Sequence, residues 1–81
     1  MKIKELRNDI KEYLKKHNLE KKYQKAKQLF ETNPFHHSLN TEILEPKHNK
    51  IYSFRIDKKY RAVFIYINNT IEIIAITNHY K

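Results

Sequence analysis

Three side chains in the C-terminal half have the types needed to hold and cleave a phosphodiester: Arg55, Arg61 and His79. The chain contains only three arginines against fourteen lysines, and two of the arginines lie six residues apart. A guanidinium offers a flat, five-donor fork that matches a phosphate, whereas a lysine offers a flexible point charge. The arginine pair and the histidine that follows it therefore indicate a candidate site for phosphate chemistry.

RNA is the phosphodiester that such a site could cleave without a metal. The reaction needs a base to deprotonate the ribose 2′-OH, an acid to protonate the leaving 5′-oxygen, and cations to stabilise charge on the phosphate oxygens. Glu42, Arg61 and His79 meet this requirement, with Arg55 as a second cation. Tyr80 adds a hydroxyl group and a ring on which a base could stack. DNA lacks the 2′-OH, so this chemistry would be confined to RNA.

Each of these residues could also be present for a reason unrelated to catalysis. Glu42 can be a solvated carboxylate on a strand, and the two arginines can form surface ion pairs with Asp57 or Glu72. His79 and Tyr80 lie at the terminus, where chains commonly fray. These alternatives stay open at the level of the sequence.

The other polar motifs do not indicate a metal or a cofactor. His36, His37 and His48 could be considered as metal ligands, but neighbouring loop histidines bind metals poorly unless a third ligand converges on them. A chain without glycine cannot form a glycine-rich phosphate loop. We therefore expect neither a metal site nor a cofactor.

The composition predicts one small domain over residues 1–81. The chain has no cysteine, no signal-peptide pattern and no apolar run of membrane-spanning length, so we expect a cytoplasmic protein that does not enter a membrane. The formal net charge of +8 favours a polyanionic partner, although a composition rich in Lys, Asn and Ile accounts for part of it. Four lysines near the arginines are candidate RNA-binding residues: Lys47, Lys50, Lys58 and Lys59.

The first part of the chain has the periodicity of helices. Apolar residues at three- and four-residue spacing predict helices over about 2–16 and about 19–32, joined as an antiparallel hairpin. Asn18 is placed to cap the second helix. Asn33–Pro34 should end that helix, because the residue before a proline avoids the helical region.

After Pro34 the periodicity changes to two, as in strands. Aromatic and β-branched residues predict strands over about 39–44, 51–56, 60–67 and 71–77. The turns between the last three fall at Asp57–Lys59 and at Asn68–Asn69, since asparagine tolerates the positive φ that turns require. The expected fold class is α+β, with a helical hairpin packed on a small antiparallel sheet of three to four strands.

The turn lengths decide which side chains share a face of this sheet. A three-residue turn over 57–59 pairs Ile56 with Tyr60 and sets Arg55 opposite Arg61. The other face then carries the apolar and aromatic residues that should receive the helices: Tyr52, Phe54, Ile56, Ala62, Phe64 and Tyr66. Two like charges opposite each other repel, so a carboxylate or a ligand phosphate should lie near the arginines.

The last hairpin decides whether His79 reaches the same face as Arg61. With a two-residue turn at Asn68–Asn69, the alternation of side chains places His79 on the face away from Arg61. A three-residue turn that includes Thr70 places both residues on one face. We favour the longer turn.

From Pro34 to the C-terminus, the chain resembles the RelE/ParE superfamily of bacterial toxins, and within it the YoeB branch. The resemblance rests on a Pro-Phe segment, a Glu-x-Leu strand, an aromatic-Ser-x-Arg-Ile strand, an acidic turn, Tyr-Arg-x-Val-Phe and a terminal His-Tyr. It implies that Glu42 is the general base and His79 the general acid. It also implies that Arg61 clamps the phosphate with help from Arg55, and that Tyr80 positions the substrate.

The N-terminus departs from this resemblance. Members of the superfamily begin with a β-strand before the first helix, whereas the periodicity here places the start of the chain inside the helix. Loss of that strand should expose a sheet edge, which could pair with a partner strand or form a dimer with a second copy.

The resemblance leads to one principal functional hypothesis and two alternatives. The principal one is the toxin of a type II toxin–antitoxin system, a metal-independent endoribonuclease that cleaves mRNA in the ribosomal A site and is neutralised by a cognate acidic antitoxin. The first alternative is a non-catalytic binder of the same fold, comparable to gyrase inhibitors or to an inactivated toxin remnant, which would not need Glu42 and His79. The second, a basic RNA- or ribosome-binding module, rests on charge alone.

Overall fold

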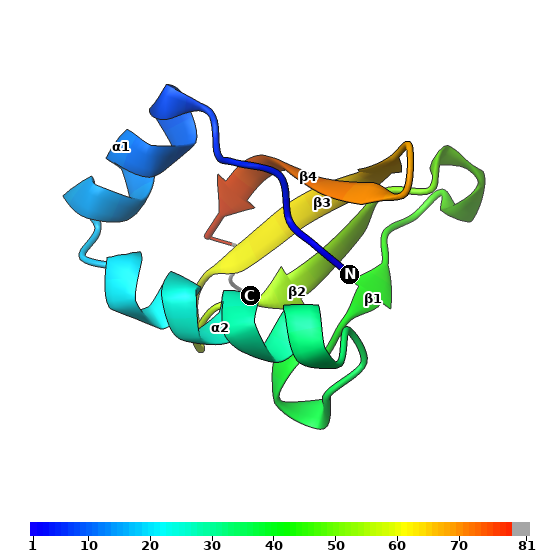
Figure 1. The fold of residues 1–81 in the computed structure, drawn as a ribbon, viewed down its shortest axis with the longest axis horizontal. Helices are drawn as coiled ribbons and strands as arrows, with labels where there is room; N and C mark the ends of the chain where they lie inside the picture. Colours follow the sequence, from blue (N-terminus) through cyan, green and yellow to red (C-terminus); the bar gives the residue numbers. More distant parts are fainter. Residues whose placement is uncertain (79–81) are drawn as a thin grey trace.

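The computed structural model describes residues 1–78, which form two helices and a four-stranded antiparallel sheet (Figure 1). The strand order is β1-β2-β3-β4. In chain order the elements are α1 (Asn8–Lys16), α2 (Glu20–Thr32), the 3₁₀ turn η1 (His37–Leu39), β1 (Glu42–Ile43), the 3₁₀ turn η2 (Lys47–Asn49), β2 (Tyr52–Arg55), β3 (Arg61–Ile67) and β4 (Thr70–Thr77). The predicted α+β fold class is confirmed. No helix within residues 1–78 has the length and apolarity to cross a bilayer.

The N-terminal segment is extended, so the prediction of a helix from residue 2 was wrong. Ile3 forms a parallel bridge with Ile71 of β4. The amide of Lys4 donates to the Ile71 carbonyl at 2.7 Å, and the amide of Ile71 donates to the Lys2 carbonyl at 3.1 Å. Residues 2–4 therefore cover part of the outer edge of β4, where the dark blue segment crosses β4 in Figure 1. The expectation that this strand position is empty and that the edge is bare was also wrong.

Asn18 serves the end of α1 and not the start of α2. Its φ of 56° is left-handed. The Leu19 amide donates to the Leu14 carbonyl at 2.8 Å, and the Asn18 amide donates to the Lys15 carbonyl at 3.2 Å. This bond pair is the Schellman motif that closes a helix C-terminus, which asparagine tolerates better than most residues. The predicted side-chain cap on α2 is not formed, and Leu19 occupies that position.

An aromatic cluster fills the core between the helices and the sheet. The Phe30 ring of α2 lies 4.9 Å from the Phe54 ring of β2 and 5.1 Å from the Phe64 ring of β3, measured between centroids. All three side chains are completely buried. Ala62 beside them is also buried, so the prediction that this face of the sheet receives the helices is confirmed. On the opposite face, Arg55 is exposed, Arg61 and Val63 are partly accessible, and Ser53 is buried.

The turn between β3 and β4 has two residues, so the three-residue turn that included Thr70 was wrong. Asn68 and Asn69 both have positive φ, of 50° and 66°, and Ile67 pairs with Thr70. This is the pattern of a type I′ hairpin turn, whose twist matches that of the strands.

A β-bulge in β4 nevertheless restores the alignment that the longer turn was expected to supply. Phe64 pairs with Ile73, but its neighbour Val63 pairs with Ala75, so Ile74 is an extra residue. The extra residue shifts the register by one and places Thr77 opposite Arg61. Without the bulge, Ile76 would occupy that position.

The segment after α2 is less regular than the predicted strand over 39–44. Leu39 ends the 3₁₀ turn η1, Asn40 is left-handed with a φ of 46°, and β1 contains only Glu42 and Ile43. Leu39 is buried, because the turn folds its side chain into the core. The left-handed residue reverses the chain so that Glu42 meets Ser53 of β2.

Candidate active site

Arg55 and Arg61 lie directly opposite each other at one end of the β2–β3 hairpin, as predicted. The register follows from the short turn between them, in which the Ile56 amide donates to the Tyr60 carbonyl at 2.9 Å. Arg55 is exposed, whereas only 11% of the Arg61 side chain is accessible. The two guanidinium groups therefore differ in environment, and Arg61 is the more firmly positioned of the two.

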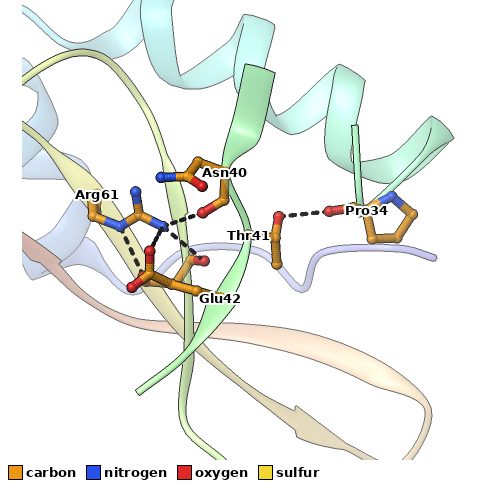
Figure 2. A network of polar contacts seen from close by, with 6 residues as sticks. Pro34, Asn40, Thr41, Glu42 and Arg61 are labelled. Atoms are coloured by element: carbon orange, nitrogen blue, oxygen red, sulfur yellow. Dashed lines mark hydrogen bonds and ion pairs between the residues drawn. The ribbon is translucent and has the colours of Figure 1, made fainter. Parts of the chain in front are cut away.

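Arg61 is fixed by hydrogen bonds to two neighbouring segments (Figure 2). Its Nε donates to the Ser53 hydroxyl at 2.9 Å. Its Nη2 donates to the Asn40 carbonyl at 2.6 Å and to the Ser53 carbonyl at 3.2 Å. Among residues 1–78 the other terminal nitrogen, Nη1, makes no hydrogen bond, so its N–H groups are available to an anion.

Glu42 supplies the carboxylate that the opposed arginines require. Its Oε2 lies 3.5 Å from Arg61 Nη2, and just over half of the Glu42 side chain is exposed. An ion pair this exposed contributes little to stability. The Glu42 carboxylate is therefore accessible to a group that binds beside Arg61.

A pocket of about 220 Å³ lies beside these two residues. Ser53 and Thr77 contribute hydroxyl groups to its wall, and Leu44 and Val63 contribute apolar surface. The volume is below the range of pockets that enclose drug-sized molecules. It suits a phosphate group and part of a sugar, with the remainder of a polymer lying outside.

The surroundings of Arg61 shift the pKa of its guanidinium in both directions. Burial lowers the pKa of its guanidinium, the Glu42 carboxylate raises it, and the neighbouring charge of Arg55 lowers it again. An arginine remains protonated through such changes, because its ordinary pKa lies far above neutral pH. The half-buried cation is less screened by water than a surface lysine, which strengthens its attraction for a phosphate.

Sequence reasoning did not assign Ser53 and Asn40 to the site. Ser53 is almost completely buried, and both its hydroxyl and its carbonyl oxygen accept from Arg61. A serine in an apolar strand, on the face shared with two arginines, was an available signal. Asn40 acts only through its backbone carbonyl, for which the side chain gives no signal.

The remaining predicted cations separate into two groups. Lys58 and Lys59 are exposed in the turn that joins β2 and β3, next to Arg55 and Arg61. Lys47 and Lys50 are exposed at the opposite end of β2, in and beside η2. A single phosphate therefore cannot contact both groups.

His79 and Tyr80 lie outside the described residues. The ion pairs considered for the arginines are not formed within residues 1–78, because Asp57 binds Lys22 and the carboxylate near Arg61 is that of Glu42. The same part of the chain contains no group of three or more His, Asp or Glu side chains with the arrangement of a metal site.

The turn that holds the two arginines opposite each other depends on Asp57. Its Oδ1 accepts from the Lys59 amide at 2.9 Å and from the Tyr60 amide at 2.8 Å, and Oδ2 lies 3.1 Å from Lys22 Nζ. Burial alone would raise the pKa of Asp57, but the amides of Tyr60 and Lys59 and the Lys22 ammonium together lower it. The carboxylate thus fixes the turn and ties it to α2.

Replacing Asp57 by alanine should destabilise the protein by about 2 kcal/mol near neutral pH, because two backbone amides lose a charged acceptor. A lowered folded-state pKa means that this stabilisation is fully present above the unfolded value of about 3.9 and is lost as the pH falls through the folded value. Urea unfolding of wild type and Asp57→Ala at about pH 7 and at about pH 3 measures the difference. Asp57→Asn keeps one acceptor oxygen and should lose less. A difference between wild type and Asp57→Ala that is no smaller at the lower pH would contradict the explanation.

The larger pocket of the molecule lies elsewhere. It measures about 460 Å³ and lies between the N-terminal segment and the two helices, with Ile3, Leu14 and Tyr23 in its lining. Of its two acidic residues, Glu5 and Glu20, the first is paired with Lys11 at 2.8 Å, and no arginine lines the pocket. We place the site at the smaller pocket because the fixed cation and the carboxylate converge there.

Comparisons with known proteins support the fold more strongly than the activity. No family model matches the chain. An uncharacterized protein of Haemophilus influenzae is 47% identical over 38 residues, which are 47% of this chain and 38% of that protein. The chain therefore spans well under half the length of that relative.

A solved structure matches the whole chain. A chain of the YoeB–YefM complex from Staphylococcus aureus superimposes with a TM-score of 0.70, covering 99% of this chain and 98% of that one. The two sequences are 23% identical, so the likeness concerns the arrangement of the backbone. This chain therefore has the RelE/ParE-like α+β fold of the YoeB type.

Proposed function

We propose that this protein is the toxin of a type II toxin–antitoxin system and that it cleaves ribosome-bound mRNA without a metal. The observation that carries the proposal is the state of Arg61, whose side chain is only 11% accessible: Nε and Nη2 are held by hydrogen bonds, and Nη1, near the Glu42 carboxylate, makes none within residues 1–78. The likeness in fold to a chain of a two-protein complex supports a protein partner. The net charge of +8 favours an acidic one, the cognate antitoxin.

The proposed reaction assigns one task to each group. Arg61 holds a non-bridging phosphate oxygen, and Glu42 accepts the proton of the ribose 2′-OH. The 2′-oxygen then bonds to phosphorus while the bond to the 5′-oxygen breaks, giving a 2′,3′-cyclic phosphate. His79 protonates the departing 5′-oxygen. Arg55 stabilises the charge that gathers on the phosphate, and Tyr80 positions the substrate.

The described end of β4 lies beside Arg61. Thr77 lies opposite Arg61 and lines the same pocket. The exposed Lys58 and Lys59 lie at the same end of the sheet and would contact neighbouring phosphates.

Expression in bacteria tests the proposal directly. Induction of the wild type should arrest growth, and Glu42→Gln, which keeps the shape but not the basicity, should relieve the arrest, as should His79→Ala. Primer extension on cellular messages should show new ends at ribosomal A-site codons for the wild type only. Co-expression with an acidic partner protein should restore growth to the wild type.

Two outcomes would contradict the proposal in different ways. Arrest by wild type and Glu42→Gln alike, without new RNA ends, would indicate a non-catalytic binder. New RNA ends on protein-free messages and none on ribosomes would indicate a nuclease with a different target.

A further inference from the structure

Phe35 exposes more of its surface than any other large apolar side chain within residues 1–78. It is 75% accessible, compared with 50% for Met1, 43% for Tyr66 and 38% for Ile67. A phenyl ring left in water forgoes the stabilisation that burial in the core would provide. The ring is therefore available to a ligand, and its position in the structure indicates the class of ligand.

The backbone around Phe35 is fixed and leads to the candidate active site. The Phe35 amide donates to the Asn33 side chain at 3.1 Å, and the Thr41 hydroxyl donates to the Pro34 carbonyl at 2.6 Å (Figure 2). The Pro34 carbonyl belongs to the peptide bond that joins Pro34 to Phe35, and Thr41 directly precedes Glu42. This hydrogen bond therefore holds the backbone at Phe35 close to the start of β1, where Glu42 lies.

The same loop contacts the phosphate-binding arginine. Its last residue, Asn40, accepts a hydrogen bond from Arg61 at 2.6 Å. Two backbone hydrogen bonds of η1 fix the shape of this loop. The Leu39 amide donates to the His36 carbonyl, and the Asn40 amide donates to the His37 carbonyl. The loop that carries Phe35 is thus held in one position relative to Arg61.

The neighbours of Phe35 favour a nucleobase over a protein surface as its partner. Apart from Pro34, its neighbours in the sequence are polar: Asn33, His36, His37 and Ser38. The rings of His36 and His37 stack with their centroids 4.6 Å apart. An aromatic anchor for another protein usually lies within a larger apolar patch. A single exposed ring beside imidazoles, on a protein of net charge +8, has the character of a surface on which unpaired bases stack.

We propose that Phe35 is a stacking platform for an unpaired base of the message, close to the phosphate that Arg61 holds. This inference rests on the proposed function and adds a specificity-determining residue to it. Stacking on Phe35 would hold one nucleotide in register with Glu42. The base that occupies this position would then influence which sites in a message are cut.

The test measures binding of the fluorescently labelled protein to ribosomes programmed with a message that is 2′-O-methylated, so that it binds without being cleaved. Phe35→Ala and Phe35→Leu should each weaken binding by about 10-fold to 100-fold, because leucine keeps the apolar character but not the ring. Phe35→Trp should bind at least as tightly as the wild type. Tyr66→Ala, which removes another exposed ring, is the matched control and should bind as the wild type does.

Removing single bases from the message locates the contact. One abasic position should reproduce the loss seen with Phe35→Ala and should cause no further loss in that variant. Binding by Phe35→Leu as tight as that of the wild type would overturn the inference. So would a message in which removing a base at any position weakens binding by Phe35→Ala still further. Normal RNA binding by Phe35→Ala together with lost binding of a partner protein would also overturn it, in favour of a protein contact.

The failure of this inference can be separated from that of the proposed function. If the wild type neither binds programmed ribosomes nor cuts their messages, both fail together. If the wild type binds and cuts, and Phe35→Ala does the same with unchanged affinity and site preference, only the role of Phe35 fails.

Discussion

Replacing Arg61 by alanine is expected to lower the rate of RNA cleavage on ribosomes by about 100-fold to 1,000-fold, the usual effect of removing one preorganised group that stabilises transition-state charge. The expectation follows from the fixed geometry of the guanidinium. Ser53 and Asn40 hold Nε and Nη2, so the guanidinium is oriented before any ligand binds. Single-turnover cleavage of a programmed message, followed over time, measures the effect.

Two companion variants separate the charge of Arg61 from its orientation. Arg61→Lys keeps the charge but cannot reproduce the donor geometry, so it should recover only a small part of the rate. Ser53→Ala leaves the charge and removes one acceptor that orients it, so it should lose less than Arg61→Ala. Arg55→Ala, at the exposed opposing position, should also lose less. A rate for Arg61→Ala close to that of the wild type would exclude Arg61 as the phosphate clamp.

The stability of Arg61→Ala must be measured in parallel. The substitution leaves the buried Ser53 hydroxyl and two carbonyl groups without their donor, at a cost of about 1–3 kcal/mol for each group that water cannot reach. Circular dichroism and urea unfolding should show a folded but less stable protein. The kinetic comparison then applies to the folded fraction.

Replacing Phe30 by alanine is expected to destabilise the protein by about 3–5 kcal/mol. The ring is completely buried, and it contacts Phe54 and Phe64 at centroid distances near 5 Å, so its removal leaves a cavity between α2 and the sheet. Natural domains have unfolding free energies of about 5–15 kcal/mol, and one of 81 residues belongs at the lower end. Much of the Phe30→Ala protein should therefore be unfolded at growth temperature.

Thermal unfolding measures this prediction. At about 4–8 °C per kcal/mol for a domain of this size, the midpoint should fall by roughly 12–40 °C. Tyr66→Ala removes an aromatic ring that is 43% exposed and should change the midpoint much less. Similar midpoints for the two variants would mean that the aromatic cluster does not carry the stability of the core.

The sequence by itself determined the last three strands and the pairing between the first two of them. Asp57, followed by two lysines, indicated a short turn, and that turn length alone sets Arg55 opposite Arg61. The same turn length, combined with the alternation of side chains along each strand, predicted that Phe54, Ala62 and Phe64 lie against the helices. Local rules suffice here because side-chain alternation and a tight turn propagate register over only a few residues.

The sequence also indicated positive φ at the Asn68–Asn69 turn. Without glycine, left-handed positions fall mostly on asparagines: of the five within residues 1–78, four are Asn18, Asn40, Asn68 and Asn69. The fifth is Lys50, which nothing in the sequence indicated. Asn18 was assigned to the wrong helix end, because the same side chain suits both a cap and a left-handed turn.

The tertiary structure decided the features that depend on distant parts of the chain. Ile3 fits a helical period as well as it fits a strand, and its bridge to Ile71, 68 positions away, selected the extended form. The bulge at Ile74 places an ordinary apolar residue out of register, so composition could not reveal it, yet it brings Thr77 opposite Arg61. The sequence therefore shows which residue types form the site. Their alignment depends on the extra bulge residue in β4 and on backbone carbonyl groups that only the folded chain brings together.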